Sequence, residues 1–283
     1  MDRNLALNLA RVTEAAALSA GKWLGRGDKN AADKAAVDAM RRMFDTVEID
    51  GTVVIGEGEI DEAPMLYIGE NIGTKTGENE VDIAVDPIDG TNSIAHGMAN
   101  SIAVLAVAPK GCLLHAPDIY MDKIACGPKA KGCINLDDSP SDNIKRVAKA
   151  LDKNVEDITV AILDRPRHED IIDEIRSIGA RIKKISDGDI VTAIETCYED
   201  SGIDLVIGRG GAPEGVIAAA ALKCLGGDFQ GRLHPTDDKQ IERCKNLNSN
   251  LDKIYNIDDL VKGNEVIFSV TGITSGEILD GVK

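Results

Sequence analysis

The chain is poor in aromatic residues and has no long apolar runs. Only 3% of its 283 residues are Phe, Trp or Tyr, whereas hydrophobic residues as a whole make up 43%. A core must therefore be built from Ala, Val, Ile and Leu in packed layers of helix and sheet, which predicts an α/β protein. The longest apolar runs are too short to span a bilayer, so we expect no membrane partner.

Basic charge is also scarce, and this argues against another class of partner. The chain has 32 basic and 48 acidic residues, which gives a formal net charge of -16. Because nucleic-acid binding depends on a clustered basic surface, nucleic acid is not an expected partner. A small phosphorylated substrate remains compatible with this charge if bound metal and a few well-placed Arg or Lys residues supply the positive charge.

Neither Cys nor His shows the spacing of a metal site. The four histidines lack the spacing of a zinc site, and the cysteines have no close pair. The cysteines, which we expect to be reduced and packed thiols, are Cys112, Cys126, Cys133, Cys197, Cys224 and Cys244. Charged residues interrupt the opening segment, so no secretory signal pattern is evident, and a soluble cytoplasmic protein is expected.

Hydrophobic periodicity predicts the order of elements. Two amphipathic helices are expected first, one from Leu5 to Trp23 and one from Asp33 to Phe44. Short apolar strands should follow at 53–55, 81–85 and 102–108.

A stretch rich in Gly, Pro, Ser and Asp, residues 127–142, is the best candidate for a domain boundary. Strands near Ile158, Ile182, Ile203 and Val266 alternate with helices after it. We therefore expect two α/β units, an N-terminal one over 1–140 and a C-terminal one over 141–283.

The run from Val81 to Thr91 is an apolar strand that ends in two carboxylates and a hydroxyl. Pro87 cannot donate a ladder hydrogen bond and favours an extended Asp86, so the chain is expected to leave the sheet there, with Asp86 and Asp89 close together on a tight turn. Two carboxylates about 4 Å apart repel by roughly 4 kcal/mol at an effective dielectric of 20. Such a turn suits a bound cation, although an ordinary solvated Asp-rich turn is the alternative.

Other carboxylates stand at the ends of predicted elements. Glu214 follows the Gly-rich stretch 208–211 and Pro213, which reads as a strand, a turn and a helix start. Helix capping by Asp33 and a solvated acidic loop around Glu57 remain open. Oxygen ligands of this kind suit Mg²⁺ or Mn²⁺. The candidate set comprises Asp33, Glu57, Asp86, Asp89 and Glu214.

Two further stretches follow predicted strands, where α/β sheets commonly hold ligands. The first is Arg165 to His168, in which Arg165 and Arg167 on either side of Pro166 could clamp phosphate oxygens, although a solvated basic turn is the alternative. Asp187 and Asp189 could accept hydrogen bonds from sugar hydroxyls, or they could simply cap a helix.

These motifs together resemble a known family. The stretches Gly56 to Tyr67, Asp86 to Thr91, Arg165 to Arg167 and Gly210 to Gly215 closely resemble the bacterial class II fructose-1,6-bisphosphatases. The Asp86 to Thr91 motif by itself indicates only the wider superfamily of metal-dependent, lithium-sensitive sugar and inositol phosphatases. The resemblance extends from the first helix to Thr274.

The resemblance implies a layered αβαβα sandwich, the sugar phosphatase fold, with the active site between two α/β units. It implies hydrolysis of the 1-phosphate of fructose 1,6-bisphosphate to fructose 6-phosphate, a step of gluconeogenesis, with Mn²⁺ or Mg²⁺ as cofactor. A homo-oligomer, dimer or tetramer, is also implied. By motif, the implied metal ligands are Asp33, Glu57, Asp86, Asp89 and Glu214. The implied substrate contacts are Asp89, Gly90, Thr91, Tyr120, Arg165, Pro166, Arg167, Asp187, Gly188, Asp189 and Gly211.

For catalysis we expect the Thr91 hydroxyl to orient the attacking water and Asp61 to assist it. Two departures from the family pattern keep the charge: Asp89 stands where several relatives have Glu, and Arg165 where some have Lys. The alternatives are a related phosphatase acting on sedoheptulose bisphosphate or an inositol phosphate, and a non-catalytic sugar-phosphate sensor.

Overall fold

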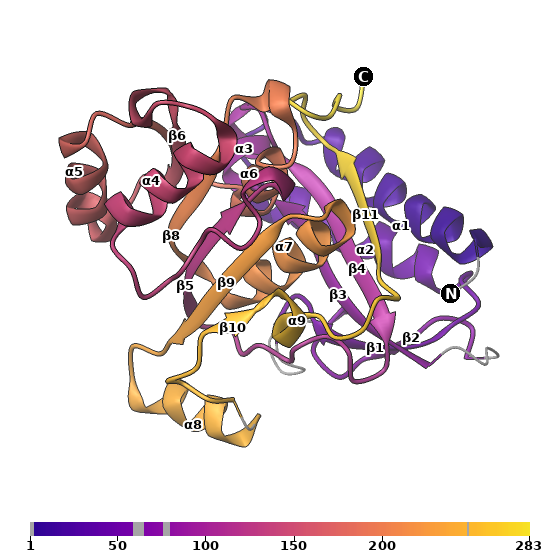
Figure 1. Ribbon diagram of the computed structural model, residues 1–283. Coiled ribbons are helices and arrows are strands. Elements are labelled where there is room, and N and C mark those ends of the chain that lie inside the picture. The colour runs from indigo at the N-terminus through magenta and orange to yellow at the C-terminus, as the bar shows by residue number, and fades with distance from the viewer. Residues whose placement is uncertain (1–2, 59–64, 76–79, 248) are drawn as a thin grey trace. The chain divides into compact units, whose positions relative to one another are not determined.

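The chain divides into two compact units, both of which contain helices and a sheet (Figure 1). The computed structural model describes residues 3–58, 65–75, 80–247 and 249–283. Unit 1 comprises Met1–His115 and Val261–Lys283, and unit 2 comprises Ala116–Leu260. The α/β class is therefore confirmed. None of the helices in these ranges is long and apolar enough to cross a membrane.

Unit 1 is built on a five-stranded sheet with the order β11-β4-β3-β1-β2. Neighbouring β1 and β3 are parallel, and the other pairs are antiparallel. The strands are β1 (Asp50–Ile55), β2 (Asn71–Ile72), β3 (Glu80–Asp89), β4 (Ile102–Pro109) and β11 (Ile267–Gly272).

Two long helices pack on this sheet, as their apolar spacing predicts. The helices of unit 1 are α1 (Arg3–Gly21), α2 (Lys29–Phe44) and the short α3 (Thr91–His96). Helix α1 packs against β11, β4 and β3, while α2 packs against α1 and β3. Leu9, Met40 and Phe44 are fully buried in the core that results. Asp28 caps α2 by accepting a hydrogen bond from the Ala31 amide at 2.9 Å.

Strand β3 does not stop at Val85, which corrects the expected turn. Asp86 pairs with Val104 of β4, and Asp89 pairs with Ile102, with a shift of register between them. Pro87 lies within this irregularity, where its missing amide costs no ladder bond. The two carboxylates therefore stand on the bulged end of a strand rather than on a turn beyond it.

Unit 2 is built on a six-stranded sheet with the order β10-β9-β5-β8-β6-β7. Strands β7, β6 and β8 are parallel, whereas β5 is antiparallel to both β8 and β9. The strands are β5 (Tyr120–Cys126), β6 (Thr159–Leu163), β7 (Arg181–Ile185), β8 (Leu205–Gly211), β9 (Asp228–His234) and β10 (Tyr255–Asn256).

Helices α4 and α5 share a core of Ile and Val with this sheet, and α7 packs against β5, β8 and β9. The α-helices are α4 (Pro140–Leu151), α5 (Glu169–Ser177), α6 (Asp189–Glu195), α7 (Ala212–Leu225), α8 (Asp238–Asn246) and α9 (Ile257–Leu260). Short 3₁₀ turns are η1 (Pro128–Ala130), η2 (Val155–Asp157), η3 (Pro166–His168) and η4 (Glu199–Ser201).

The division between the units differs from the expected one at residue 140, for two reasons. Strand β5 lies before that point but pairs with β8 and β9 of unit 2. Strand β11 lies near the C-terminus but pairs with β4 of unit 1. Both pairings join residues far apart in sequence, so local composition gave no sign of them.

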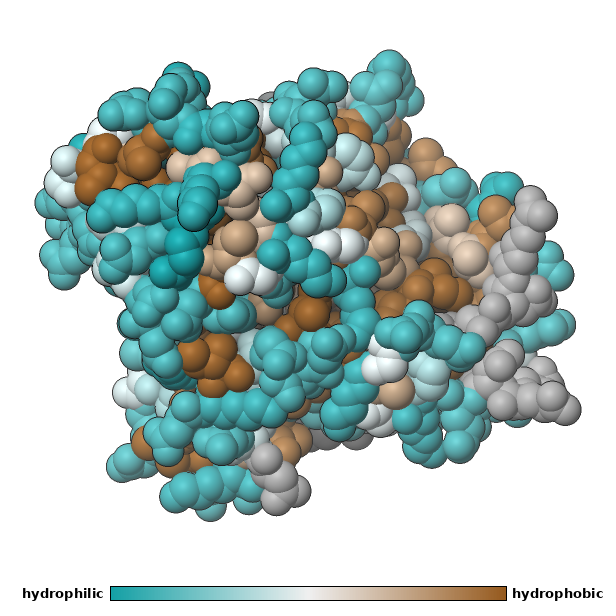
Figure 2. All heavy atoms as spheres, in the orientation of Figure 1, coloured by the Kyte–Doolittle hydropathy of each residue, from teal (hydrophilic) through white to brown (hydrophobic). Residues whose placement is uncertain are grey.

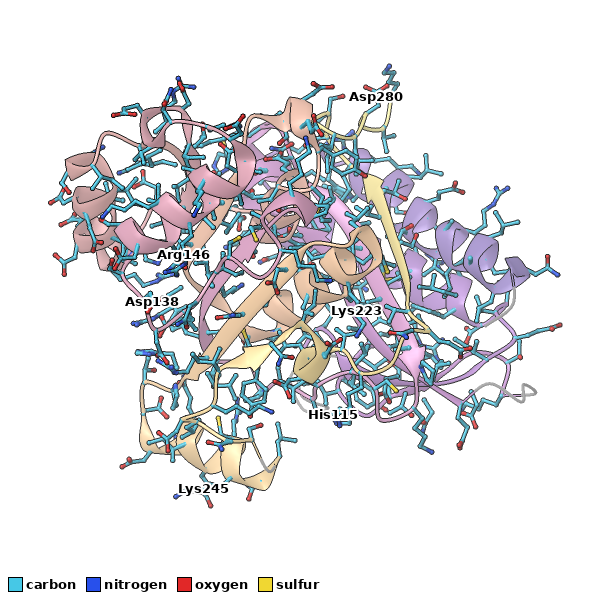
Figure 3. The ribbon with its side chains drawn as sticks, viewed as in Figure 1. His115, Asp138, Arg146, Lys223, Lys245 and Asp280 are labelled. Atoms are coloured by element: carbon cyan, nitrogen blue, oxygen red, sulfur yellow. The ribbon has the colours of Figure 1, made fainter. Side chains whose placement is uncertain are left out.

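The loop expected to be a boundary is part of unit 2. Arg146 on α4 pairs with Asp138 at 2.9 Å and donates to the Cys133 carbonyl at 2.7 Å (Figure 3). Buried Asn143 donates to three carbonyls of the same loop, at Asn135, Asp138 and Ser139. The loop is thus tied to α4 rather than linking two bodies.

Polar side chains cover most of the face shown in Figure 2, with apolar residues in scattered patches. All six cysteines are free thiols, as the sequence predicts. Burial raises the pKa of the Cys126 thiol well above its usual range. Its thiolate is therefore disfavoured at neutral pH.

Candidate active site

In unit 1, the bulged end of β3 leads directly into α3. Asp89 is 5% exposed and Asp86 is half-buried, with the Asp86 Oδ1 accepting a hydrogen bond from the Ile88 amide at 3.0 Å. Gly90 has a φ of 91°, in the left-handed region that glycine adopts without strain. Thr91, the first residue of α3, follows at once and is half-buried. Two carboxylates and the predicted catalytic hydroxyl thus lie within six consecutive positions.

Asp33 and Glu57 form a second acidic pair in unit 1. Asp33 lies on α2, and Glu57 follows β1, where its amide donates to the Leu66 carbonyl at 3.0 Å. Burial raises the pKa of both carboxyls, and the Asp33 charge helps to raise that of Glu57 to about 8. The two groups therefore interact electrostatically. A bound cation would relieve this, because an opposite charge favours the carboxylate form.

In unit 2, Arg165 and Arg167 follow β6 and are held by backbone carbonyls. Arg165 donates to the Asp164 carbonyl at 2.9 Å and to the Ser186 carbonyl at 2.8 Å. Arg167 donates to the Arg209 carbonyl, and its guanidinium lies 4.8 Å from the centre of the Tyr120 ring. The structure records no ion pair within 4 Å between either guanidinium and a described carboxylate. Both charges are thus fixed in place without being neutralised.

Asp189 forms a largely buried ion pair at the start of α6. Gly188, with a φ of 78°, precedes it, and Asp187 is half-buried. The Asp189 Oδ2 lies 2.6 Å from the Nζ of Lys123 on β5, which is only 6% exposed. Because the carboxylate is already oriented by a cation, its position is defined before any ligand binds.

Glycines at the end of β8 leave space for these side chains. A Cβ on Gly210 would lie 2.3 Å from the Asp189 Oδ2 and 2.9 Å from the Lys123 Nζ, and one on Gly211 would lie 1.9 Å from the Glu214 Oε2. The sequence predicted a Gly-rich turn at 208–211, but β8 continues through Gly211 and α7 begins at Ala212. These two glycines are required for clearance, not for a turn.

Glu214 lies in the first turn of α7 and is the acidic residue that best fits a metal ligand. Its Oε2 is buried and has no hydrogen-bond partner among the described residues. Burial raises the pKa of this carboxyl, and the nearby Lys123 opposes the rise. A buried carboxylate oxygen without a partner is costly, whereas a hard divalent cation would satisfy it.

The predicted residues are thus shared between the units. Unit 1 contains Asp33, Glu57, Asp86, Asp89, Gly90 and Thr91, and unit 2 contains Tyr120, Arg165, Pro166, Arg167, Asp187, Gly188, Asp189, Gly211 and Glu214. Asp61 lies outside the described residues. In the part of the chain that is described, no three His, Cys, Asp or Glu side chains gather closely enough to hold a metal ion.

Sequence reasoning missed Lys123 and did not foresee the contacts of His168. Lys123 stands in a strand that was not predicted, and it is paired with Asp189, which lies much later in the chain at the start of α6. His168 belongs to the stretch from Arg165 that the sequence offered for substrate contacts, but no role within that stretch was assigned to it. The available signal was its place directly after the two arginines, a few residues beyond an apolar strand.

Comparison with known proteins supports the resemblance over the whole chain. The family model described as bacterial fructose-1,6-bisphosphatase, glpX-encoded, matches residues 3–283. Fructose-1,6-bisphosphatase 1 class 2 of Escherichia coli (strain K12) is 51% identical, with all of this chain and 88% of that protein aligned. Fructose-1,6-bisphosphatase class 2 of Haemophilus influenzae is 48% identical, with all of this chain and 89% of that protein aligned.

A solved structure, the extragenic suppressor from Pyrococcus furiosus, matches 68% of each chain at 13% identity, with a TM-score of 0.35. The fold and the residues described above define an α/β protein with acidic groups suited to a cation and fixed arginines suited to an anion. The chain belongs to the family of bacterial class 2 fructose-1,6-bisphosphatases, by the family match and by the identity to its relatives.

Proposed function

We propose that this chain hydrolyses the 1-phosphate of fructose 1,6-bisphosphate, giving fructose 6-phosphate and phosphate, with Mn²⁺ or Mg²⁺ as cofactor. Family membership supports the reaction, and the E. coli and H. influenzae relatives are named for it. The observation in the structure that supports it best is the pair Arg165 and Arg167, held by backbone carbonyls. Two fixed cations that are not neutralised suit a substrate with phosphate groups.

The residues that would hold the metal are Asp33, Glu57, Asp86, Asp89 and Glu214. Their carboxylate oxygens, and the partnerless Oε2 of Glu214 above all, fit a hard divalent cation. When bound, such a cation neutralises phosphoryl oxygens and lowers the pKa of a coordinated water.

The other residues bind and orient the substrate. Arg165 and Arg167 would contact phosphate oxygens, and Asp189, oriented by Lys123, would accept a hydrogen bond from a sugar hydroxyl. Thr91 would hydrogen-bond to the attacking water through its hydroxyl and to a phosphate oxygen through its amide. Its place at the first residue of α3 leaves that amide without an intrahelical acceptor.

Phosphate release is the direct test. The purified chain should release phosphate from fructose 1,6-bisphosphate when Mn²⁺ or Mg²⁺ is present and release none in excess chelator. Sedoheptulose 1,7-bisphosphate and inositol 1-phosphate should be poorer substrates when compared by kcat/KM. A higher kcat/KM for either would assign the chain to that substrate instead. Binding of fructose 1,6-bisphosphate with no release under any metal would indicate a sensor.

A further inference from the structure

His168 is a buried histidine that bridges the ends of β6 and β8. It is 1% exposed and lies at the end of η3, directly after Arg167. Its Nδ1 lies 2.7 Å from the Leu163 carbonyl, the last residue of β6. Its Nε2 accepts a hydrogen bond from the Arg209 amide of β8 at 2.8 Å.

These two partners fix the state of the ring. The Arg209 amide can only donate, so Nε2 must be unprotonated, and the Leu163 carbonyl can only accept, so Nδ1 must carry the hydrogen. The imidazole is therefore neutral, with one defined tautomer. Burial lowers the pKa of His168, and the charges of Arg167, Arg209 and Arg165 act in the same direction.

Arg209 connects His168 to the predicted phosphate-binding residue. Its amide donates to His168, while its carbonyl accepts from the Arg167 Nη2 at 2.7 Å and the Arg167 Nε at 3.3 Å. The Arg209 side chain is used elsewhere, in an ion pair with Asp122 at 2.6 Å. Arg167 and His168 are adjacent in sequence. Their side chains thus bind the two backbone groups of Arg209, its carbonyl and its amide respectively.

The strand is adapted to this arrangement at Gly208. It has a φ of 144°, and a Cβ there would lie 3.2 Å from the His168 Cε1 and 3.3 Å from its Nε2. A cavity of about 20 Å³ is lined by His168 together with Lys123 and Asp189. The ring thus contacts the residue that orients Arg167 and borders the same cavity as the ion pair of Lys123 and Asp189.

We propose that His168 is a positioning residue for sugar-phosphate binding. By holding the Arg209 amide, it fixes the carbonyl that orients the Arg167 guanidinium toward a phosphate group of the substrate. The proposal rests on the proposed function, in which Arg167 contacts substrate. It assigns no proton transfer to His168, whose two nitrogens are both engaged within the protein.

Two isosteric substitutions separate the two hydrogen bonds. In His168→Asn the amide nitrogen takes the place of Nδ1 and can still donate to Leu163, but nothing reaches Arg209. In His168→Gln the side-chain oxygen takes the place of Nε2 and can accept from the Arg209 amide. We expect the Asn variant to raise the KM for fructose 1,6-bisphosphate about tenfold, with kcat changed less than about twofold, because an interaction with a charged group is weakened. The Gln variant should stay within about threefold of wild-type KM.

A double-mutant cycle tests whether the effect passes through Arg167. If it does, His168→Asn should raise KM no further when added to Arg167→Met. The control is His115→Asn, an exposed histidine in unit 1 (Figure 3), which should leave both constants unchanged. The proposal would be overturned if His168→Asn raised KM by the same factor with and without Arg167→Met. It would also be overturned if the His168→Asn and His168→Gln variants had equal KM values.

Two measurements keep the test decisive. Circular dichroism of each variant shows whether it folds. If His168→Asn does not fold, a KM of His168→Gln raised by more than about threefold still overturns the proposal. Nitrogen-15 NMR of the wild-type chain should show His168 protonated at Nδ1 and not at Nε2, and the opposite tautomer would also overturn it. A wild-type chain that releases no phosphate refutes the proposed function, whereas an active chain with an unaffected Asn variant refutes only the role of His168.

Discussion

The buried pair of Lys123 and Asp189 makes the sharpest prediction about stability. Lys123 is 6% exposed, and its Nζ lies 2.6 Å from the Asp189 carboxylate. At that separation the two charges attract by about 6 kcal/mol at an effective dielectric of about 20. Removing both ions from water costs several kcal/mol each, so the pair as a whole contributes little net stability.

Removing one partner is a different perturbation. In Lys123→Met the Asp189 carboxylate is left without its cation. Glu214 also loses the nearby positive charge of Lys123, which in the wild-type chain counteracts the rise in the Glu214 pKa. We expect the free energy of unfolding to fall by about 3–5 kcal/mol. In the double variant Lys123→Met/Asp189→Leu no unpaired charge is left at this pair, so the loss should be at least about 1 kcal/mol smaller than in Lys123→Met.

Urea unfolding followed by circular dichroism, with metal removed by a chelator, measures these differences. Fluorescence is less suitable, because the only tryptophan, Trp23, lies in unit 1. The matched control is Lys129→Met, which removes an exposed pair with Glu199 at 2.5 Å and should lower the free energy of unfolding far less, because solvent screens exposed charges. If Lys123→Met is no more destabilising than Lys129→Met, the reasoning about burial is refuted.

Two further predictions concern unit 1. Thr91→Ala should lower kcat by about 10²–10³, whereas Thr91→Ser should keep most of the wild-type kcat. The Mn²⁺ affinity measured by calorimetry should be unchanged in both variants. A fully active Thr91→Ala variant would contradict the role of the hydroxyl. In the metal-free chain the pKa of Glu57 is raised from 4.5 to about 8, so the folded state keeps a proton that the unfolded state loses. The free energy of unfolding should therefore fall as pH rises through that interval, and Glu57→Gln should reduce the slope by up to about 1.4 kcal/mol per pH unit in urea titrations; identical slopes would contradict this.

Helices α1 and α2 and the strands β1, β3 and β4 of unit 1 were predictable because their causes are local. The periodic apolar residues of α1 and α2 and the buried run of β4 lie where the pattern places them. Strand β5 was not predictable, because Asp122 and Lys123 interrupt its apolar pattern. Their compensating partners, Arg209 and Asp189, are contributed by a strand and a helix much later in the chain.

The glycines of β8 are a second feature whose structural role could not be predicted from the sequence. In a single sequence, Gly208 to Gly211 indicate a flexible turn, because glycine's commonest local effect is on the backbone. In the structure these positions lie in a strand, and three of them make space for side chains of His168, Lys123 and Glu214. The motif was correctly associated with a site, but its physical cause lies in packing that only the folded chain reveals.

Net charge is the property least informative about this site. A chain with 48 acidic and 32 basic residues offers many carboxylates with which an exposed arginine can pair. Arg165 and Arg167 are instead oriented by the carbonyls of Asp164, Ser186 and Arg209, which fix a guanidinium without cancelling its charge. Hydrogen bonds to backbone carbonyls therefore allow an acidic protein to keep two guanidinium charges available to a phosphate. The positions of these two charges then depend on where the backbone carbonyls lie. This is why a neutral histidine that holds the Arg209 amide can matter to substrate binding without touching the substrate.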